Sequence, residues 1–221
     1  MITRFVPDVN DAVAGVESGH TLMVGGFGGA GFPFALRDAL SRRGLSDLTV
    51  IANNADFGAL ADAGSLKRMI CSFPTGPTSG SVIRGIEESQ IELLLTPQGT
   101  LVEQIHAGGS GLGGFLTPTG RDTELAARWS VVDFQGESYL LVPPLRADVA
   151  LIKASVADEM GNLVHHKASR NFNPLMAMAA DLTVAQVDRV VPSGELDPDM
   201  IHVPSVFVDV VVVGGARSES H

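Results

Sequence analysis

Short apolar runs alternate with amphipathic stretches through the first half of the chain. Runs rich in Val, Ile and Leu are typical of buried strands, and they occupy residues 21–25, 48–52, 68–72 and 91–96. The spacing between them predicts a helix over 8–18, a helix from Pro33 to a stop at Gly44, and a helix before each later strand. Strands separated by helices indicate βαβ units, so we expect an α/β fold with an open, mostly parallel sheet and flanking helices.

The second half of the chain has a different pattern. Residues 129–142 predict two antiparallel strands around Gly136, and Asn173-Pro174 marks a boundary before a short helix over 175–180. Further strand-like runs lie at 148–153, 182–191 and 206–213, with turn-forming residues at 158–162. No internal repeat or long linker divides the sequence. We therefore expect one domain over 1–214, some antiparallel strands in its second half, and a frayed tail over 215–221.

The composition excludes several classes of protein. The 221 residues include 15 Lys and Arg against 25 Asp and Glu, a formal net charge of −10, which is the opposite of a nucleic-acid-binding footprint. A single cysteine excludes a disulfide framework and fits a reducing cytosol. The sequence has no apolar run long enough for a membrane span and no signal-peptide core at its start. A soluble cytoplasmic protein is expected.

Charged residues make up only 18% of the chain, below the roughly 25% of an average domain. The chain therefore has fewer charged side chains to expose to solvent than an average domain. Two interpretations stay open: a compact, well-buried α/β core, or a subunit that covers part of its surface with a partner.

A glycine-rich segment follows the first predicted strand. Gly26-Phe27-Gly28-Gly29-Ala30-Gly31 has the spacing G-x-G-x-x-G, which lets backbone amides approach a phosphate or a carbonyl oxygen. A dinucleotide site would also need an acidic residue at the end of the next strand, and Asn53-Asn54 stand there instead. We favour a backbone-lined wall of an active site, with a purely structural tight turn as the alternative.

Three carboxamide side chains follow predicted strands. Asn53 and Asn54 come directly after the second strand, and Gln98 lies in the turn Thr96-Pro97-Gln98-Gly99-Thr100 after the strand that ends near 96. Ligands bind outside this carboxyl edge in open α/β sheets. The asparagines could instead cap a helix, but a glutamine adds little to a turn, so a functional role is favoured for Gln98.

Other candidates carry weaker signals. A second glycine cluster at 108–114 could form a flexible lid, a wall whose backbone a ligand approaches closely, or a mobile surface loop without a ligand. Cys71 has the pattern of a small buried hydrophobe. His165 and His166 are adjacent and would face opposite ways on a strand, so we expect no metal site. No bound cofactor is expected either. The sequence lacks the G-x-S-x-G elbow of serine hydrolases and the P-loop of nucleoside triphosphatases.

Several motifs taken together resemble one known family. The run Gly25-Gly26-Phe27-Gly28-Gly29-Ala30-Gly31-Phe32-Pro33 is similar to the signature of the alpha subunit of the 3-oxoacid coenzyme A-transferases. The resemblance continues in order along nearly the whole chain, through Asn53-Asn54-Ala55, residues 69–74 (MICSFP), 97–101 (PQGTL), 115–120 (FLTPTG), 147–153 (ADVALIK), Gly161-Asn162, 168–174 (ASRNFNP) and 194–198 (GELDP).

The resemblance implies a CoA-transferase fold of family I type and a ping-pong exchange of coenzyme A (CoA) between two acids, typically from succinyl-CoA to a 3-oxoacid. In that family a glutamate of a homologous beta subunit, in a Ser-Glu-Asn-Gly-type motif, forms an acyl anhydride and then a glutamyl-CoA thioester. This chain has no such motif, and Glu137 and Glu195 stand in other settings. The resemblance therefore implies half of an enzyme, active as a heterodimer or a dimer of heterodimers.

The resemblance also assigns roles to matching positions. Gln98, Asn53 and Asn54 are expected in the catalytic pocket as neutral donors to an oxyanion. The wall that binds substrate and CoA is expected to include Gly25, Gly26, Gly28, Gly29 and Gly31, and Gly108 and Gly109 of the second cluster.

The sequence departs from the family pattern at two positions. Phe34 stands where a glutamate is common, and the acidic residue that is frequent near Val142 is missing. Among acceptors we favour 3-oxoadipate, because the whole-length pattern is most similar to bacterial aromatic-degradation transferases. The alternative function is a stand-alone α/β domain that binds acyl-CoA or a sugar phosphate, or acts as an isomerase.

Overall fold

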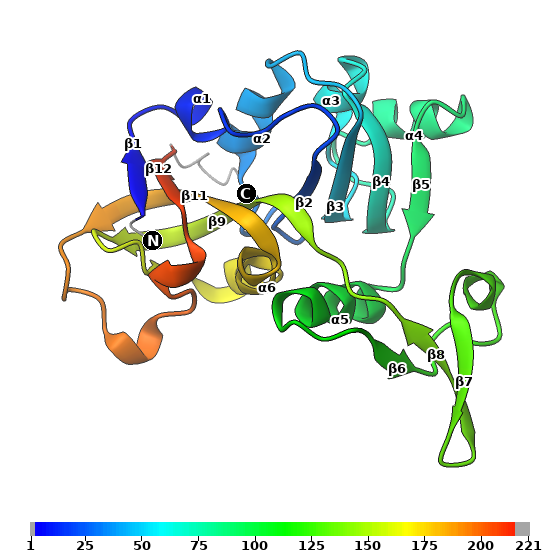
Figure 1. Ribbon diagram of the computed structural model, residues 1–221. Coiled ribbons are helices and arrows are strands. Elements are labelled where there is room, and N and C mark those ends of the chain that lie inside the picture. Colours follow the sequence, from blue (N-terminus) through cyan, green and yellow to red (C-terminus); the bar gives the residue numbers. More distant parts are fainter. Residues whose placement is uncertain (1–2, 215–221) are drawn as a thin grey trace.

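The computed structural model describes residues 3–214, which are built around one large sheet (Figure 1). Eight of its nine strands form a continuous parallel path, and β10 (Leu163–Val164) pairs antiparallel with β9. In spatial order the path is β1 (Arg4–Val6), β12 (Val210–Val213), β11 (Ala180–Val191), β9 (Ala147–Asp158), β2 (Thr21–Val24), β3 (Leu48–Asn54), β4 (Leu66–Phe73) and β5 (Glu92–Leu95). The predicted α/β class with a mostly parallel sheet is confirmed.

Helices cover both faces of this sheet, which explains why its strands are apolar on both sides. On one face lie α1 (Val9–Ala12), α2 (Phe34–Ser41), α3 (Gly58–Asp62) and α4 (Gly80–Glu87); on the other lie α5 (Gln98–Gly109) and α6 (Asn173–Met178). Neighbouring residues of one strand enter opposite cores: Leu22 packs with the first group of helices and Met23 with the second, and both are fully buried.

A second, smaller sheet projects from the end of the large one near α5 (Figure 1). It is antiparallel, in the order β6 (Phe115–Thr117), β8 (Glu137–Val142), β7 (Ser130–Phe134). Gln135 and Gly136 join β7 to β8 with φ of 53° and 84°, the left-handed pair that suits a two-residue hairpin. The two antiparallel strands predicted around Gly136 are therefore confirmed.

Short 3-10 helices fill the connections. They are η1 (Glu124–Arg128), η2 (Lys167–Arg170), η3 (Pro198–Met200) and η4 (Ser205–Phe207). Within residues 3–214 no helix combines the length and the apolar character needed to cross a membrane. The tail expected to fray, 215–221, lies outside the described residues.

Several predicted boundaries were wrong. The strand expected over 148–153 spans Ala147–Asp158, and the helix expected to stop at Gly44 ends at Ser41. The helix expected over 8–18 ends at Ala12, because the main chain then turns through bonds to the third residue back, from Ala14 to Asp11 and from Val16 to Val13. The strand expected to begin at 206 begins at Val210, after η4.

Two further errors concern chain segments next to the predicted site. The helix expected over 175–180 spans Asn173–Met178, because Pro174 is accepted in a first helical turn. Gln98 does not lie in a turn: it is the first residue of α5, and Pro97 caps it.

Candidate active site

The glycine-rich segment lies where the sheet reverses its order of assembly. From β2 the chain adds β3, β4 and β5 in one direction, whereas β9, β11 and β12 are added in the other. The carboxyl ends of β2 and β9 therefore flank a topological switch point, the usual place for a ligand in an open α/β sheet. Residues 25–31 follow β2 directly at this point, and the Gly25 amide donates to the Leu151 carbonyl of β9 at 3.0 Å. We call residues 25–31 the first glycine segment.

The tip of this segment is a tight, open hairpin. Phe27 and Ala30 exchange two main-chain hydrogen bonds of 3.0 Å across Gly28 and Gly29. These two glycines have φ of 55° and 90°, and a Cβ at either would have no atom within 4 Å. Glycine is thus required here by backbone conformation, and the space beyond the tip is free.

The base of the first glycine segment is held by two asparagines from the other side of the switch point. Asn171 accepts from the Gly26 amide at 3.1 Å and donates to the Ala30 carbonyl at 3.0 Å. The fully buried Asn173 donates to the Gly31 carbonyl at 3.0 Å and accepts from the Lys153 amide at 3.1 Å. A Cβ on Gly25 would overlap the Asn173 amide.

We call Asn171 and Asn173 the clamp, and sequence reasoning missed it. Asn173 was interpreted only as part of a boundary before a helix, and Asn171 received no role. The available signal was the repetition of a carboxamide at a spacing of two residues, directly after one strand-rich region and before a helix. Its partners in the first glycine segment lie more than 140 residues away in the chain, so the pairing itself needed the structure.

The three carboxamides predicted to share a pocket do meet. Gln98 Nε2 donates to Asn53 Oδ1 at 2.5 Å, and Asn53 Nδ2 donates to Asn54 Oδ1 at 2.6 Å. Asn54 Nδ2 donates in turn to the Thr75 carbonyl at 3.3 Å. Both asparagines are the last residues of β3 rather than residues beyond it, and the Gln98 side chain lies between them and the start of α5. We call this series the amide chain.

The last acceptor fixes the direction of the amide chain. A main-chain carbonyl can only accept, so Asn54 must donate its amino group to Thr75. Asn54 then presents its carbonyl to Asn53, and Asn53 presents its own carbonyl to Gln98. Each amino group keeps a second N–H, and that of the half-buried Gln98 is the one at the free end. The arrangement can offer an oriented, neutral donor to a developing negative charge.

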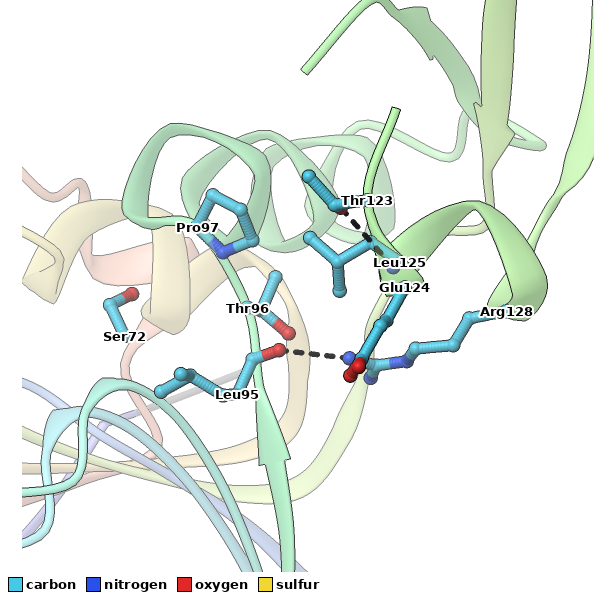
Figure 2. Close-up of a pocket in the computed structure, with 8 residues that line it drawn as sticks. All are labelled: Ser72, Leu95, Thr96, Pro97, Thr123, Glu124, Leu125 and Arg128. Atoms are coloured by element: carbon cyan, nitrogen blue, oxygen red, sulfur yellow. Dashed lines mark hydrogen bonds between the residues drawn. The ribbon is translucent and has the colours of Figure 1, made fainter. Parts of the chain in front are cut away.

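Two cavities have residues at or just before the start of α5 in their walls. One, of about 350 Å³, is shared by the first glycine segment, the start of α5 and the clamp segment, and is lined by Phe27, Gln98, Gly99, Val102, Glu103, Asn171, Phe172 and Leu175. The other, of about 580 Å³, lies between the ends of β4 and β5 and the η1 helix (Figure 2). Gln98 lines the first cavity and follows Pro97, which lines the second.

The second glycine cluster has a different explanation. Gly108 and Gly109 form the last turn of α5, and a Cβ on Gly108 would overlap the Leu145 carbonyl oxygen. On Gly109 a Cβ would lie 2.8 Å from the Met178 Cβ of α6. These contacts account for both glycines by helix packing, without a ligand, and their predicted part in CoA binding stays a prediction.

The remaining candidates do not form a reactive centre. Burial raises the pKa of the Cys71 thiol to about 11, so Cys71 is a protonated, buried side chain. His165 is buried after β10, beside His202, with its pKa lowered to about 4 by burial and then by the charge of His202. Over residues 3–214 no cluster of three or more His, Cys, Asp or Glu side chains could hold a metal ion.

Comparison with known proteins identifies the family of this chain. Residues 6–214 match the coenzyme A transferase family. The chain belongs to that family. It is 47% identical to the 3-oxoadipate CoA-transferase alpha subunit of Pseudomonas putida, over all of this chain and 98% of the relative. It is 44% identical to the acetate CoA-transferase alpha subunit of Escherichia coli K12, over 93% of this chain and 94% of the relative.

Solved structures of CoA-transferases have the same fold. An acyl-CoA transferase from Escherichia coli O157:H7, in its thioester complex with CoA, superposes on 96% of this chain with a TM-score of 0.85 at 22% identity. Our CoA-transferase chain spans about half of that longer chain, 47% of its length. The fold predicted from the resemblance, and the family itself, are confirmed.

Proposed function

We propose that this CoA-transferase chain works together with a homologous beta subunit to move CoA from succinyl-CoA to a 3-oxoacid, with 3-oxoadipate as the favoured acceptor. The amide chain carries this proposal. It presents an oriented donor in the cavity that Gln98 shares with the first glycine segment, while its own side chains are all carboxamides, which cannot act as the acid nucleophile of an anhydride mechanism. The nucleophile must therefore arrive from outside these motifs.

The chemistry consists of two equivalent half-reactions. The glutamate carboxylate that the beta subunit supplies attacks the succinyl-CoA carbonyl. The C–S bond breaks, CoA departs as a thiolate, and an acyl-glutamyl anhydride remains. The thiolate then attacks the glutamyl carbonyl, which releases succinate and leaves a glutamyl-CoA thioester. The 3-oxoacid carboxylate reverses these steps and departs as its CoA thioester.

The proposed role of Gln98 follows from the charge in each tetrahedral intermediate. A former carbonyl oxygen becomes negative there, and the free N–H of Gln98 can donate to it. Because a carboxamide is neutral, it stabilises this oxyanion without holding the nucleophilic carboxylate in an ion pair. Asn53 and Asn54 are positioning residues in this scheme, since they set which way the Gln98 amide faces.

The choice of acceptor rests on the relatives. The relative at 47% identity is named for 3-oxoadipate, whereas others at 41–44% are named for acetate or for succinyl-CoA and 3-ketoacids. We infer a heterodimer or a dimer of heterodimers, since the relatives are named as single subunits of their enzymes.

The test uses the complex of this chain with its beta subunit. After incubation with succinyl-CoA, borohydride should reduce the glutamyl thioester to an alcohol, and peptide mapping should place this mass change on the beta subunit. In the same complex, Gln98→Ala should slow transfer roughly 10²–10³-fold, the scale found for loss of one oxyanion donor. Gln98→Glu should be slower still, because its carboxylate would face the Asn53 carbonyl oxygen.

Two results would overturn the proposal. One is CoA transfer by the isolated chain, shown by mass spectrometry to be free of any partner. The other is a borohydride label on a glutamate of this chain, including Glu137 and Glu195.

A further inference from the structure

One peptide group at the end of the amide chain is held on both sides. The Thr75 carbonyl accepts from Asn54 Nδ2 at 3.3 Å. The amide of the next residue, Gly76, donates to Ser79 Oγ at 3.0 Å. This carbonyl and this N–H belong to the same planar peptide unit. A hydrogen bond that fixes the N–H therefore also fixes the direction in which the carbonyl faces Asn54.

The Ser79 hydroxyl is buried and makes two hydrogen bonds to the same residue. Ser79 is 4% exposed, and its Oγ donates to the Gly76 carbonyl at 2.9 Å while it accepts from the Gly76 amide. The main-chain amide of Ser79 adds a bond of 3.2 Å to that carbonyl. The peptide unit 75–76 therefore cannot rotate without breaking a buried hydrogen bond.

The Asp56 carboxylate holds the same loop from the other side. Its Oδ1 accepts from the Thr78 amide at 3.0 Å, across 22 residues of sequence. The carboxylate also lies against Gly76: a Cβ there would be 2.2 Å from Asp56 Oδ1, so only glycine leaves room for this contact. Asp56 follows the end of β3 by two residues. The strand that supplies Asn54 thus leads directly to the group that holds the acceptor of Asn54.

Asp56 is itself fixed by α2. Its main-chain carbonyl accepts from Arg37 Nη1 at 3.1 Å, and Arg37 is buried, with 8% of its surface exposed. The Arg37 guanidinium carbon lies 5.4 Å from the centre of the Phe32 ring, and Phe32 directly follows the first glycine segment. The amide chain and the first glycine segment therefore share one support.

Loss of the Thr75 acceptor would remove the direction of the amide chain. A carboxamide can turn by half a rotation, which exchanges its oxygen and its nitrogen, and the Thr75 carbonyl is compatible with one of these arrangements of Asn54. If Asn54 turned, Asn53 and Gln98 would turn with it to keep their mutual bonds. A carbonyl oxygen would then take the place of the Gln98 amino group, and a developing negative charge there would meet an acceptor instead of a donor.

We propose that Asp56 and Ser79 are positioning residues for the transfer reaction. They hold the peptide unit 75–76 so that the Thr75 carbonyl keeps the amide chain, and with it the free N–H of Gln98, in the orientation that stabilises the oxyanion. Neither residue lines the cavity that Gln98 shares with the first glycine segment, so both act through Gln98. This inference rests on the proposed function, because it takes Gln98 as the oxyanion donor.

The test measures kcat and KM in the complex with the beta subunit. Asp56→Ala and Ser79→Ala should each lower kcat about 3–30-fold, within the range of coupling expected inside one hydrogen-bond network. KM for both substrates should stay within about twofold, because the weakened interaction forms in the transition state. Asp56→Asn keeps an acceptor oxygen for the Thr78 amide and should restore most of kcat.

Asp148→Ala is the matched control. Asp148 also binds a distant main-chain amide, that of Thr21, through Oδ2 at 2.7 Å, but it does so where β2 and β9 begin, at the opposite edge of the sheet. This variant should leave kcat within about twofold of the parent value. Thermal unfolding and co-purification with the beta subunit check that every variant folds and assembles. An equal fall of kcat in Asp148→Ala and Asp56→Ala would overturn the assignment, since any lost long-range bond would then have the same effect.

A double-mutant cycle shows whether the two residues act through Gln98. In the Gln98→Ala background, Asp56→Ala and Ser79→Ala should slow transfer further by less than about twofold. Full, independent effects in that background would overturn the inference, as would an unchanged kcat in both single variants. Failure of the proposed function looks different: Gln98→Ala alone would then transfer CoA at nearly the parental rate, and the inference would fall together with its premise.

Discussion

The two glycine clusters have similar compositions, but glycine is needed in each for a different structural reason. The first glycine segment, 25–31, has a clamped base and an open tip at the switch point. The second cluster begins inside α5, where Gly108 and Gly109 allow the helix to pack against Leu145, Arg146 and the end of α6. The rest of that cluster includes Gly111 and Gly113, which have no atom within 4 Å of a Cβ.

The comparison teaches that glycine content alone does not locate a ligand site. A glycine that excludes a methyl group because protein atoms already fill the space is a packing residue. A glycine that needs a left-handed backbone next to open space can form part of a binding surface. Substitution by alanine should distinguish these two cases within each cluster.

The largest effect is expected for Gly108→Ala. Its methyl group would overlap the Leu145 carbonyl oxygen, which is backbone and cannot rotate away. We expect the free energy of unfolding to fall by about 3 kcal/mol or more, measured by urea denaturation. Gly113→Ala is the matched control in the same cluster, since its methyl group meets open space, and it should change stability by less than about 0.5 kcal/mol. Similar values for the two variants would contradict the packing role.

Acidification should destabilise the first glycine segment before the second cluster. The pKa of His165 is about 4 in the folded protein against 6.5 for an ordinary histidine, because burial and the nearby His202, Arg170 and Lys153 charges disfavour its protonation. The unfolded chain therefore binds this proton more readily than the folded one. The contribution of His165 to the free energy of unfolding is complete above pH 6.5 and is lost as the pH falls towards 4. The difference corresponds to about 3 kcal/mol.

Urea denaturation at several pH values measures this loss. Within residues 3–214 neither ring nitrogen of His165 has a hydrogen-bond partner, so His165→Leu leaves no polar group unpaired and should flatten the profile between pH 6.5 and 4. Hydrogen exchange should show the first glycine segment losing protection before the second cluster, since η2 and the clamp follow His165 directly. An unchanged slope in His165→Leu would assign the acid sensitivity to other groups.

Asn173→Ala should release the base of the first glycine segment. It removes the partners of the Lys153 amide and of the Gly31 and Ser169 carbonyls in a buried site. We expect a loss of about 2–3 kcal/mol, the usual result of leaving buried polar groups unpaired. Hydrogen exchange should increase at 25–31 and stay unchanged at 108–114; an equal increase in both clusters would mean that the clamp is not local.

The smallest structural effect is expected at the two exposed tips. Gly29 and Gly111 have φ of 90° and 70° with open space around them, so alanine at either should cost about 1 kcal/mol from backbone strain. CoA transfer by the complex separates the two sites. Under the proposed function, Gly29→Ala should slow it several-fold, whereas Gly111→Ala should match the parent. Equal rates for the two variants would remove the first glycine segment from the active site.

Much of the fold could be predicted because its signals are local. Apolar β-branched runs marked β2, β3, β4 and β5, and polar residues after them identified the carboxyl edge of the sheet. The same reasoning overextended the first helix, because Val13 and Val16 continue an apolar spacing that tighter turns also satisfy. Boundaries of this kind depend on hydrogen bonds that a hydrophobic pattern does not specify.

The site could be predicted in part for a related reason. Gln98, Asn53 and Asn54 were expected at one sheet edge, and the structure joins them by hydrogen bonds. The clamp by Asn171 and Asn173 could not be predicted, because it depends on the contact between β2 and β9 at the switch point.

The amide chain has one more consequence, which concerns protons. None of its three side chains gains or loses a proton in the range where proteins stay folded, so the donor it offers is the same in mild acid and in mild base. A pH–rate profile of transfer would then contain no inflection from Gln98, Asn53 or Asn54. Any inflection in that profile would then come from another titrating group of the complex or from the substrates. Because the amide chain adds no titration of its own, the profile would report only the other groups of the complex and its substrates.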